Sequence, residues 1–310
     1  MIEIIIWIIV LAFAIALLVK SSDYFVDYAS KIGLAMQIPQ FIIGATVVAI
    51  GTSLPELLTS IIAVLQGETT FVAGNVVGSN ISNIGLILGL ACVIGGGLKL
   101  KRNILAKDLP LALISTVLVL IVVWDSTVSL LDAFILFIPF LIILRFLLQQ
   151  KNTAVTKTEK LNPLWFGIIF LCGFGIYLGS KFTVDSVIAL TQMLPFISDT
   201  SIIALTVVAL GTSLPELSVS LAAVKQKNAD IAVGNILGSN IFNSLMVLSV
   251  PAFITPLIIS QTVLFIAIPV MILLTVLLFI FLETHKKLSK VEGYILLLIY
   301  VIYVISTFIF

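Results

Sequence analysis

Apolar stretches of about twenty residues recur along the whole chain, separated by short polar segments. A helix rises about 1.5 Å per residue, so roughly 20 apolar residues cross the hydrocarbon layer of a bilayer. The pattern predicts an all-α polytopic membrane protein with ten transmembrane helices. We place them at residues 2–20, 39–65, 70–96, 105–124, 129–148, 163–190, 201–224, 229–257, 259–282 and 292–309.

Two segments of the chain need a separate interpretation. The first apolar stretch has Glu3 near its start and lacks both a basic beginning and a small-residue cleavage site. It is therefore expected to be a retained span rather than a signal peptide. The polar segment 149–162 reads as a cytoplasmic linker that divides the chain into a first five-span repeat, 1–148, and a second, 163–310.

Lysine and arginine are concentrated in every second loop of this plan. Such residues favour the cytoplasmic side of a membrane. The odd-numbered loops contain Lys20, Lys31, Lys99, Lys101, Arg102, Lys107, Arg145, Lys151, Lys157, Lys160, Lys225, Lys227, Lys286, Lys287 and Lys290, whereas the even-numbered loops contain Glu68, Asp125 and Asp199. The odd loops are expected to be cytoplasmic and both termini extracytoplasmic, with the plasma (inner) membrane as the expected location.

An internal repeat links the two halves. Residues 42–90 align with residues 202–250 at a constant offset of 160, without a gap, and 25 of the 49 positions are identical. The longest shared blocks are TVVAIGTSLPEL, repeated as TVVALGTSLPEL, and GNVVGSN, repeated as GNILGSN. Similarity on this scale within a membrane protein indicates duplicated halves.

The second half is expected to be inserted in the opposite orientation, because each half has an odd number of spans. The charges support this independently. The loop after GTSLPE carries Glu68 in the first copy but Lys225 and Lys227 in the second. Inverted repeats are typical of secondary transporters, which hold their substrate near the bilayer midplane where the repeats meet.

Composition narrows the function further. Hydrophobic residues make up 61% of the chain and charged residues 10%, with a mean hydropathy of +1.29. A soluble domain has about 25% charged residues, so an ordinary soluble enzyme, a nucleic-acid-binding protein and a disordered chain are excluded. The net charge of +1 implies no polyanionic partner. His285 is the only histidine, and both cysteines lie in apolar runs, so imidazole and thiolate chemistry have little support.

Two carboxylates fall in the middle of apolar spans, Glu56 and Glu216, at the same position of each repeat. A charge at the bilayer centre costs about 2.5–3.5 kcal/mol on insertion scales, so these groups should face a cavity or a partner. A purely structural role, as protonated residues or as hydrogen-bonding groups between helices, remains the alternative. Pro55 and Pro215 lack an N–H and should bend the helices and free the carbonyls of Gly51 and Gly211.

Polar side chains surround both glutamates at helical spacing. Ala49, Ser53 and Glu56 share one helix face, and the second copy repeats the arrangement. Serine and asparagine follow at i, i+4 on the next helix of each repeat. An all-oxygen set without imidazole, thiolate or amine selects hard cations such as Ca²⁺ and Na⁺. Asn75, Asn80, Asn235 and Asn240 are left open between lining the site and bonding between helices, and the GxxxG glycines are expected to serve close helix packing.

The motif pair GTSLPE with GNVVGSNISN, repeated as GTSLPE with GNILGSNIFN, resembles the α-repeats of the calcium/cation antiporter superfamily, in its sodium/calcium exchanger branch. The resemblance implies that the first and sixth spans slide across a core of the other eight. It also implies a cation site at Ala49, Thr52, Ser53, Glu56, Ser79, Asn83, Ala209, Thr212, Ser213, Glu216, Ser239 and Asn243.

One position departs from part of this superfamily. Potassium-dependent relatives look as if they carry aspartate where this chain has Asn243. Asn243 therefore argues against potassium coupling and leaves the site with two formal charges. The segment 149–162 is also too short to hold a long regulatory domain of the kind found in animal relatives.

The expected function is a secondary-active antiporter, not an enzyme, that exchanges Ca²⁺ for Na⁺ by alternating access at a midplane site. A Ca²⁺/H⁺ antiporter using the same glutamates is the alternative. A cation channel fits the inverted repeat poorly, and the motifs of an intramembrane protease do not occur. The expected partners are the transported ions and the lipid bilayer, with no resident cofactor, no nucleic acid and no obligatory protein partner.

Overall fold

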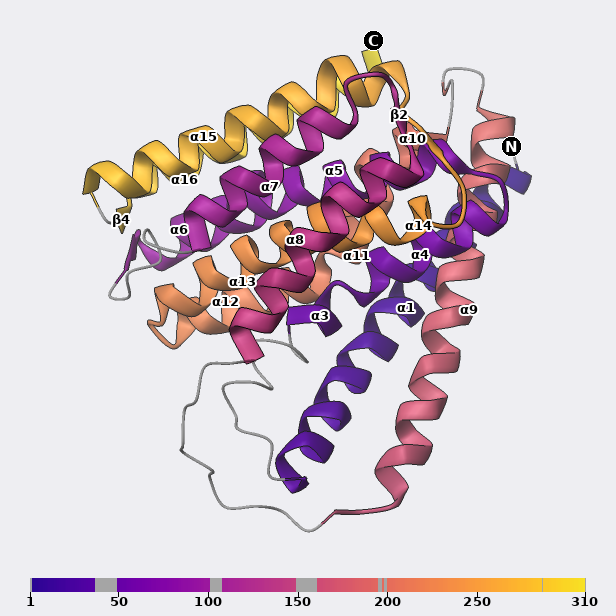
Figure 1. Cartoon of the computed structure of the whole chain (residues 1–310), viewed down its shortest axis with the longest axis horizontal. Coiled ribbons are helices and arrows are strands. Elements are labelled where there is room, and N and C mark those ends of the chain that lie inside the picture. The colour runs from indigo at the N-terminus through magenta and orange to yellow at the C-terminus, as the bar shows by residue number, and fades with distance from the viewer. Residues whose placement is uncertain are drawn as a thin grey trace.

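The computed structural model describes residues 2–36, 49–100, 108–148, 161–194, 197, 200–285 and 287–309. These residues form a bundle of helices (Figure 1). The two longest helices, α1 (Ile2–Ala35) and α9 (Leu164–Met193), pack against each other along one flank of the bundle.

The remaining elements follow in two series. The first half contains α3 (Ala49–Thr52), α4 (Leu54–Leu65), α5 (Thr69–Ile81), the π-helical segment η2 (Ser82–Leu88), α6 (Gly89–Gly95), β1 (Leu98–Lys99), α7 (Asp108–Val122), β2 (Thr127–Val128) and α8 (Leu130–Leu148). The second half contains α10 (Thr200–Ile203), η4 (Ala204–Val208), α11 (Ala209–Thr212), α12 (Leu214–Lys225), α13 (Ala229–Phe242), η5 (Asn243–Val247), α14 (Ser249–Ala252), β3 (Leu257–Ile258), η6 (Val263–Ala267), α15 (Ile268–His285), β4 (Lys287–Leu288) and α16 (Lys290–Ile309).

The prediction of a helical multi-pass membrane protein is confirmed. Six helical stretches among the described residues are long and apolar enough to cross a membrane, or seven if the bent pair Thr200–Thr212 and Leu214–Lys225 is one span. The count of ten spans and the five-plus-five division stay predictions. Part of the expected second span, residues 39–48, and most of the expected linker, residues 149–160, lie outside the described residues.

The helix that contains the first span continues past the expected end of that span. Helix α1 continues fifteen residues past position 20 to Ala35, so Lys20 and Lys31 lie within a helix rather than in a loop. Lys31 Nζ lies 2.7 Å from Asp27 Oδ2, one helical turn away. Ion pairs at i, i+4 support a helix, and this one allows charged residues to continue it.

Local contacts recur at residues 160 apart. Strand β1 pairs with β4 and strand β2 pairs with β3, so each two-stranded ribbon joins the two halves. At the start of α8 the backbone N–H of Ser129 donates to Asp132 Oδ2 at 2.9 Å. At the start of α16 the N–H of Ser289 donates to Glu292 Oε2 at 2.6 Å. The duplicated sequence therefore produces duplicated capping at equivalent helix starts.

The centre of the bundle depends on close helix contact. A Cβ atom at Gly78 would lie 2.8 Å from the Cβ of Ala209, and one at Gly74 would lie 2.8 Å from the carbonyl oxygen of Ser201. The glycines of α5 thus let η4 and its flanking helices approach it, as GxxxG spacing predicts. At Gly234 and Gly238, no described atom lies within 4 Å of such a Cβ.

Gly78→Ala is expected to destabilise the protein by about 1–3 kcal/mol, because the added methyl group overpacks the contact between α5 and α11. Gly167→Ala is the control, since Gly167 is exposed on α9 and no described atom lies within 4 Å of a Cβ there. Thermal unfolding in detergent should show a lower melting temperature for Gly78→Ala only. Equal melting temperatures would contradict the packing role.

Candidate cation-binding site

Two broken helices form the centre of the candidate site. Ser53 separates α3 from α4 with φ −95° and ψ 12°, and Ser213 separates α11 from α12 with φ −82° and ψ 7°. In each case a proline follows two residues later, and the second break bends the helix pair by 42°. Proline cannot donate to the carbonyl four residues earlier, which explains why both helices break here.

The freed carbonyl of Gly51 does not remain open. Ser22 Oγ, on α1, donates to the carbonyl oxygen of Gly51 at 2.8 Å. This bond holds α1 against the broken helix, so the Gly51 carbonyl oxygen already has a partner.

The two glutamates are held crosswise between the repeats. Ser53 Oγ donates to Glu216 Oε1 at 3.2 Å, and Ser213 Oγ donates to Glu56 Oε1 at 3.4 Å. Ser239 Oγ also donates to Glu216 Oε1, at 3.1 Å. Both glutamates are fully buried. Each half therefore supplies the serine that orients the carboxylate of the other half, which brings Glu56 and Glu216 to one place.

Five buried oxygen atoms of the predicted site accept or donate no hydrogen bond within the described part of the chain. They are Glu56 Oε2, Glu216 Oε2, Ser79 Oγ, Asn83 Oδ1 and Asn243 Oδ1. Most buried polar atoms in proteins form at least one hydrogen bond, so a cluster of buried oxygens without one needs an explanation. Hydroxyl, amide and carboxylate oxygens are the ligands of hard cations, and a bound cation would satisfy them.

The remaining predicted residues lie around this centre. Thr52 and Thr212 are buried next to the two breaks, and Ala209 is buried at the start of α11. The side chain of Ala49 lies outside the described residues, although α3 begins at this position. No three His, Cys, Asp or Glu side chains cluster anywhere in the described ranges. A cation here would thus rely on two carboxylates supplemented by neutral oxygens.

Asn75 and Asn235, whose role the sequence did not decide, form hydrogen bonds between helices. Asn75 Nδ2 donates to the carbonyl oxygen of Glu56 at 3.1 Å and to Ser60 Oγ at 3.0 Å. Asn235 makes the equivalent bonds to Glu216 and Ser220, at 3.4 and 3.3 Å. Each asparagine fixes the helix that bears a glutamate. Ser60 and Ser220 were not among the predicted site residues, although their identity at the offset of 160 could have marked them.

A second amide network joins the two motif helices. Asn83 Nδ2 donates to Asn240 Oδ1 at 2.9 Å, and Asn240 Nδ2 donates to the carbonyl oxygen of Asn80 at 3.2 Å. Asn80 Nδ2 donates to Ser244 Oγ at 2.9 Å. The Asn83 amide is thereby oriented with its nitrogen engaged and its oxygen free, the orientation a cation ligand needs.

Comparisons with known proteins show which family this chain resembles. The family model described as sodium/calcium exchanger protein matches residues 6–149 and 164–309. The sodium/calcium exchanger MaX1 of Methanosarcina acetivorans is 33% identical, over 96% of this chain and 97% of its own length. The inner membrane protein YrbG of Escherichia coli is 37% identical over 77% of each chain. A structure of the sodium-calcium exchanger NCX_Mj, soaked with Na⁺ and Sr²⁺, has a TM-score of 0.68 at 32% identity, covering 98% of this chain and 99% of that chain.

Glu56→Gln and Glu216→Gln are each expected to weaken Ca²⁺ binding about tenfold or more, because each removes a charge-assisted contact worth roughly 1.5–3 kcal/mol. Glu283→Gln is the control, since Glu283 is exposed at the end of α15. Isothermal titration calorimetry of the detergent-solubilised protein measures the affinities. Unchanged affinity in both site variants would contradict the assignment.

Proposed function

The chain belongs to the sodium/calcium exchanger family, and on this premise we propose that it exchanges Ca²⁺ for Na⁺ by alternating access at the site around Glu56 and Glu216. The family and its solved relatives support a calcium/cation antiporter in an integral membrane protein. The choice of counter-ion, the mechanism and the ligand set are the proposal.

The crossed arrangement of the two glutamates carries the proposal. Both carboxylates are fully buried, each accepts a serine hydroxyl from the opposite repeat, and each keeps one oxygen unsatisfied. Two unpaired carboxylates in a medium of low dielectric constant are costly. One Ca²⁺ neutralises both charges, and so do two Na⁺.

This charge balance explains why the site would exchange ions rather than release them freely. An empty, ionised site resists closure, because closure removes water from two like charges. A site loaded with one Ca²⁺ or two Na⁺ closes without that penalty. The closed state, which must precede opening to the other side, is thus favoured only when one ion set or the other is bound.

Protons are the other candidate counter-ions. The free Oε2 atoms of Glu56 and Glu216 can each take a proton, which would neutralise the pair as two Na⁺ do. The only histidine, His285, lies at the end of α15, so a proton would reach the glutamates without an imidazole relay. Ca²⁺/H⁺ exchange therefore needs no other residues than Ca²⁺/Na⁺ exchange.

The proposed orientation follows from the charged loops. Lys225 ends α12 and Lys227 lies in the turn after it, whereas the turn after α4 carries Glu68. By the positive-inside rule the α12 turn is cytoplasmic and the α4 turn extracytoplasmic.

Proteoliposomes loaded with Na⁺ are expected to take up ⁴⁵Ca²⁺ at equal internal and external pH, because the outward Na⁺ gradient supplies the driving force. Glu216→Gln should abolish this uptake and Glu283→Gln should not. Uptake that ignores Na⁺ but follows an imposed pH gradient would replace Na⁺ by H⁺ in the proposal. A Glu216→Gln variant with full uptake would contradict the site.

Replacement of choline by K⁺ on both sides of the same vesicles is expected to leave the initial rate of ⁴⁵Ca²⁺ uptake unchanged. The reason is that Asn243 contributes a neutral amide, so the site has no third carboxylate for an additional monovalent cation. An absolute requirement for K⁺ would contradict this reading of Asn243.

A further inference from the structure

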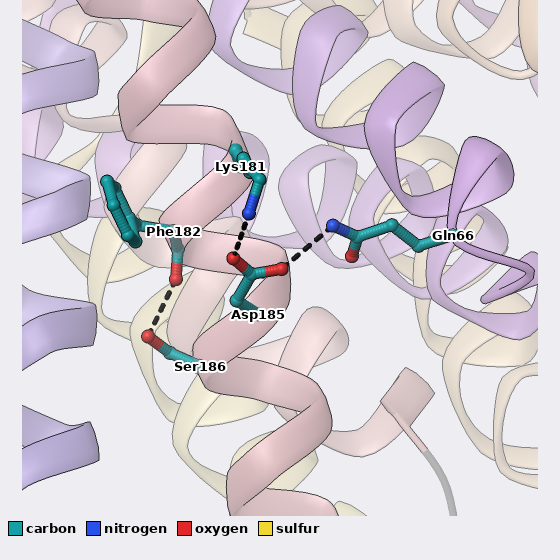
Figure 2. A network of polar contacts seen from close by, with 5 residues as sticks. All are labelled: Gln66, Lys181, Phe182, Asp185 and Ser186. Carbon is teal, nitrogen blue, oxygen red and sulfur yellow. Dashed lines mark hydrogen bonds and ion pairs between the residues drawn. The ribbon is translucent and has the colours of Figure 1, made fainter.

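Asp185 ties the long helix α9 to the end of α4 (Figure 2). Its Oδ2 atom lies 2.7 Å from Lys181 Nζ, one turn earlier on α9. Its Oδ1 atom accepts a hydrogen bond of 2.8 Å from Gln66 Nε2. Gln66 is the C-cap residue of α4, the helix that carries Glu56. Asp185 thus bonds to Lys181 on its own helix and, through Gln66, to the end of α4.

The repeat contains the same groups in an open arrangement. Gln226 corresponds to Gln66 at the offset of 160, and it is the C-cap residue of α12, the helix that carries Glu216. Asp27 corresponds to Asp185, because SDYFVDYA at 22–29 aligns with SKFTVDSV at 180–187 at an offset of 158, with the serine, the valine and the aspartate identical. Asp27 Oδ2 binds Lys31, but its Oδ1 atom and the Gln226 amide form no side-chain hydrogen bond with any described residue. The Asp27 side chain is 54% exposed, against 25% for Asp185.

The two long helices are also placed unequally over the breaks. A Cβ at Gly51 would meet Val26, and a Cβ at Gly211 would meet Ile15, so both broken helices face α1. Helix α9 instead packs along α4. Ser22 on α1 donates to the Gly51 carbonyl at 2.8 Å, whereas its counterpart Ser180 on α9 has no partner in the described ranges.

We propose that Gln66–Asp185 and Gln226–Asp27 are two alternating latches, the Gln66 latch and the Gln226 latch, of which only one closes at a time. This inference rests on the proposed function, since it assigns these residues to alternating access. In the present structure the Gln66 latch is closed and the Gln226 latch is open. Movement of α1 and α9 along the bundle opens the first, closes the second and brings Ser180 to the Gly211 carbonyl.

The two lysines fit this role. Each aspartate has a lysine one turn away, which keeps the carboxylate paired when its latch is open. The opening of a latch therefore leaves no isolated charge at the flank of the bundle. The two latches have the same donor and acceptor groups, so the exchange of one for the other changes the free energy little.

The test is a distance between α1 and α12. Nitroxide labels at Tyr24→Cys and Lys225→Cys, in a Cys92→Ala/Cys172→Ala background, report this distance by pulsed electron paramagnetic resonance in lipid nanodiscs. Both label positions are exposed. Gln66→Leu removes the first latch and is expected to raise the short-distance population about three- to tenfold, the effect of one hydrogen bond. Addition of Gln226→Leu should reverse this rise.

Asn228→Leu is the matched control, because it is an amide-to-leucine change at an exposed position in the turn that contains Gln226. Added to Gln66→Leu, it should leave the short-distance population high. No change on Gln66→Leu, or a reversal by Asn228→Leu equal to that by Gln226→Leu, would overturn the proposal.

The distance measurement requires no transport. A shift on Gln66→Leu without Na⁺-dependent ⁴⁵Ca²⁺ uptake by the wild-type protein would therefore sustain the latches and reject the proposed exchange. Uptake without a shift would do the reverse.

Discussion

The burial of two carboxylates in an apolar bundle is the constraint on which the rest of the structure depends. Glu56 and Glu216 are fully buried, and neither has a lysine or arginine partner in the described residues. Such groups persist only where hydrogen bonds and a counter-ion compensate the loss of water. The helix breaks provide this compensation. Each break places a serine toward the opposite glutamate, and each following helix supplies an asparagine to the glutamate's own backbone. The helix breaks, the serines and the amides thus all compensate the burial of the two carboxylates.

The internal duplication explains this arrangement, because the same motif occurs twice and supplies both halves of the site. The serine of one repeat binds the glutamate of the other, so neither repeat forms the site alone. The glycines of α5 allow the close approach that these bonds require. The polar network extends to Asn80, Asn83 and Asn240, whose amides join the two motif helices directly. A change in the relative position of the repeats would therefore act on both carboxylates together.

The sequence was sufficient to predict a helical membrane protein, the repeat, and Glu56 and Glu216 as a buried pair. The cost of placing a charge in an apolar span and the identity of the two repeats can both be read directly from the order of residues. The sequence could not predict that Ser53 would bind Glu216 rather than its own neighbour, since that depends on how the two halves pack. The first span was predicted to end at position 20, and the continuation of its helix to Ala35 was not expected, because hydropathy counts Asp27 and Lys31 as two separate charges. Paired one turn apart, they continue the helix.

Symmetry also limits how the protein can move. Two repeats with equivalent sequences can adopt either of two arrangements. The contacts that one repeat makes in the first arrangement are made by the other repeat in the second. In the centre, the bonds of Asn75 and Asn235 are equivalent and obey the symmetry. The centre is not fully symmetric, because Ser239 donates to Glu216 while its counterpart Ser79 has no partner among the described residues. The contacts of α1 and α9 also differ, since Ser22 is bonded while Ser180 is not, and Asp185 is bonded to glutamine while Asp27 is not. An exchange of roles between the two flanking helices would therefore be coupled to an exchange of contacts at the two glutamates.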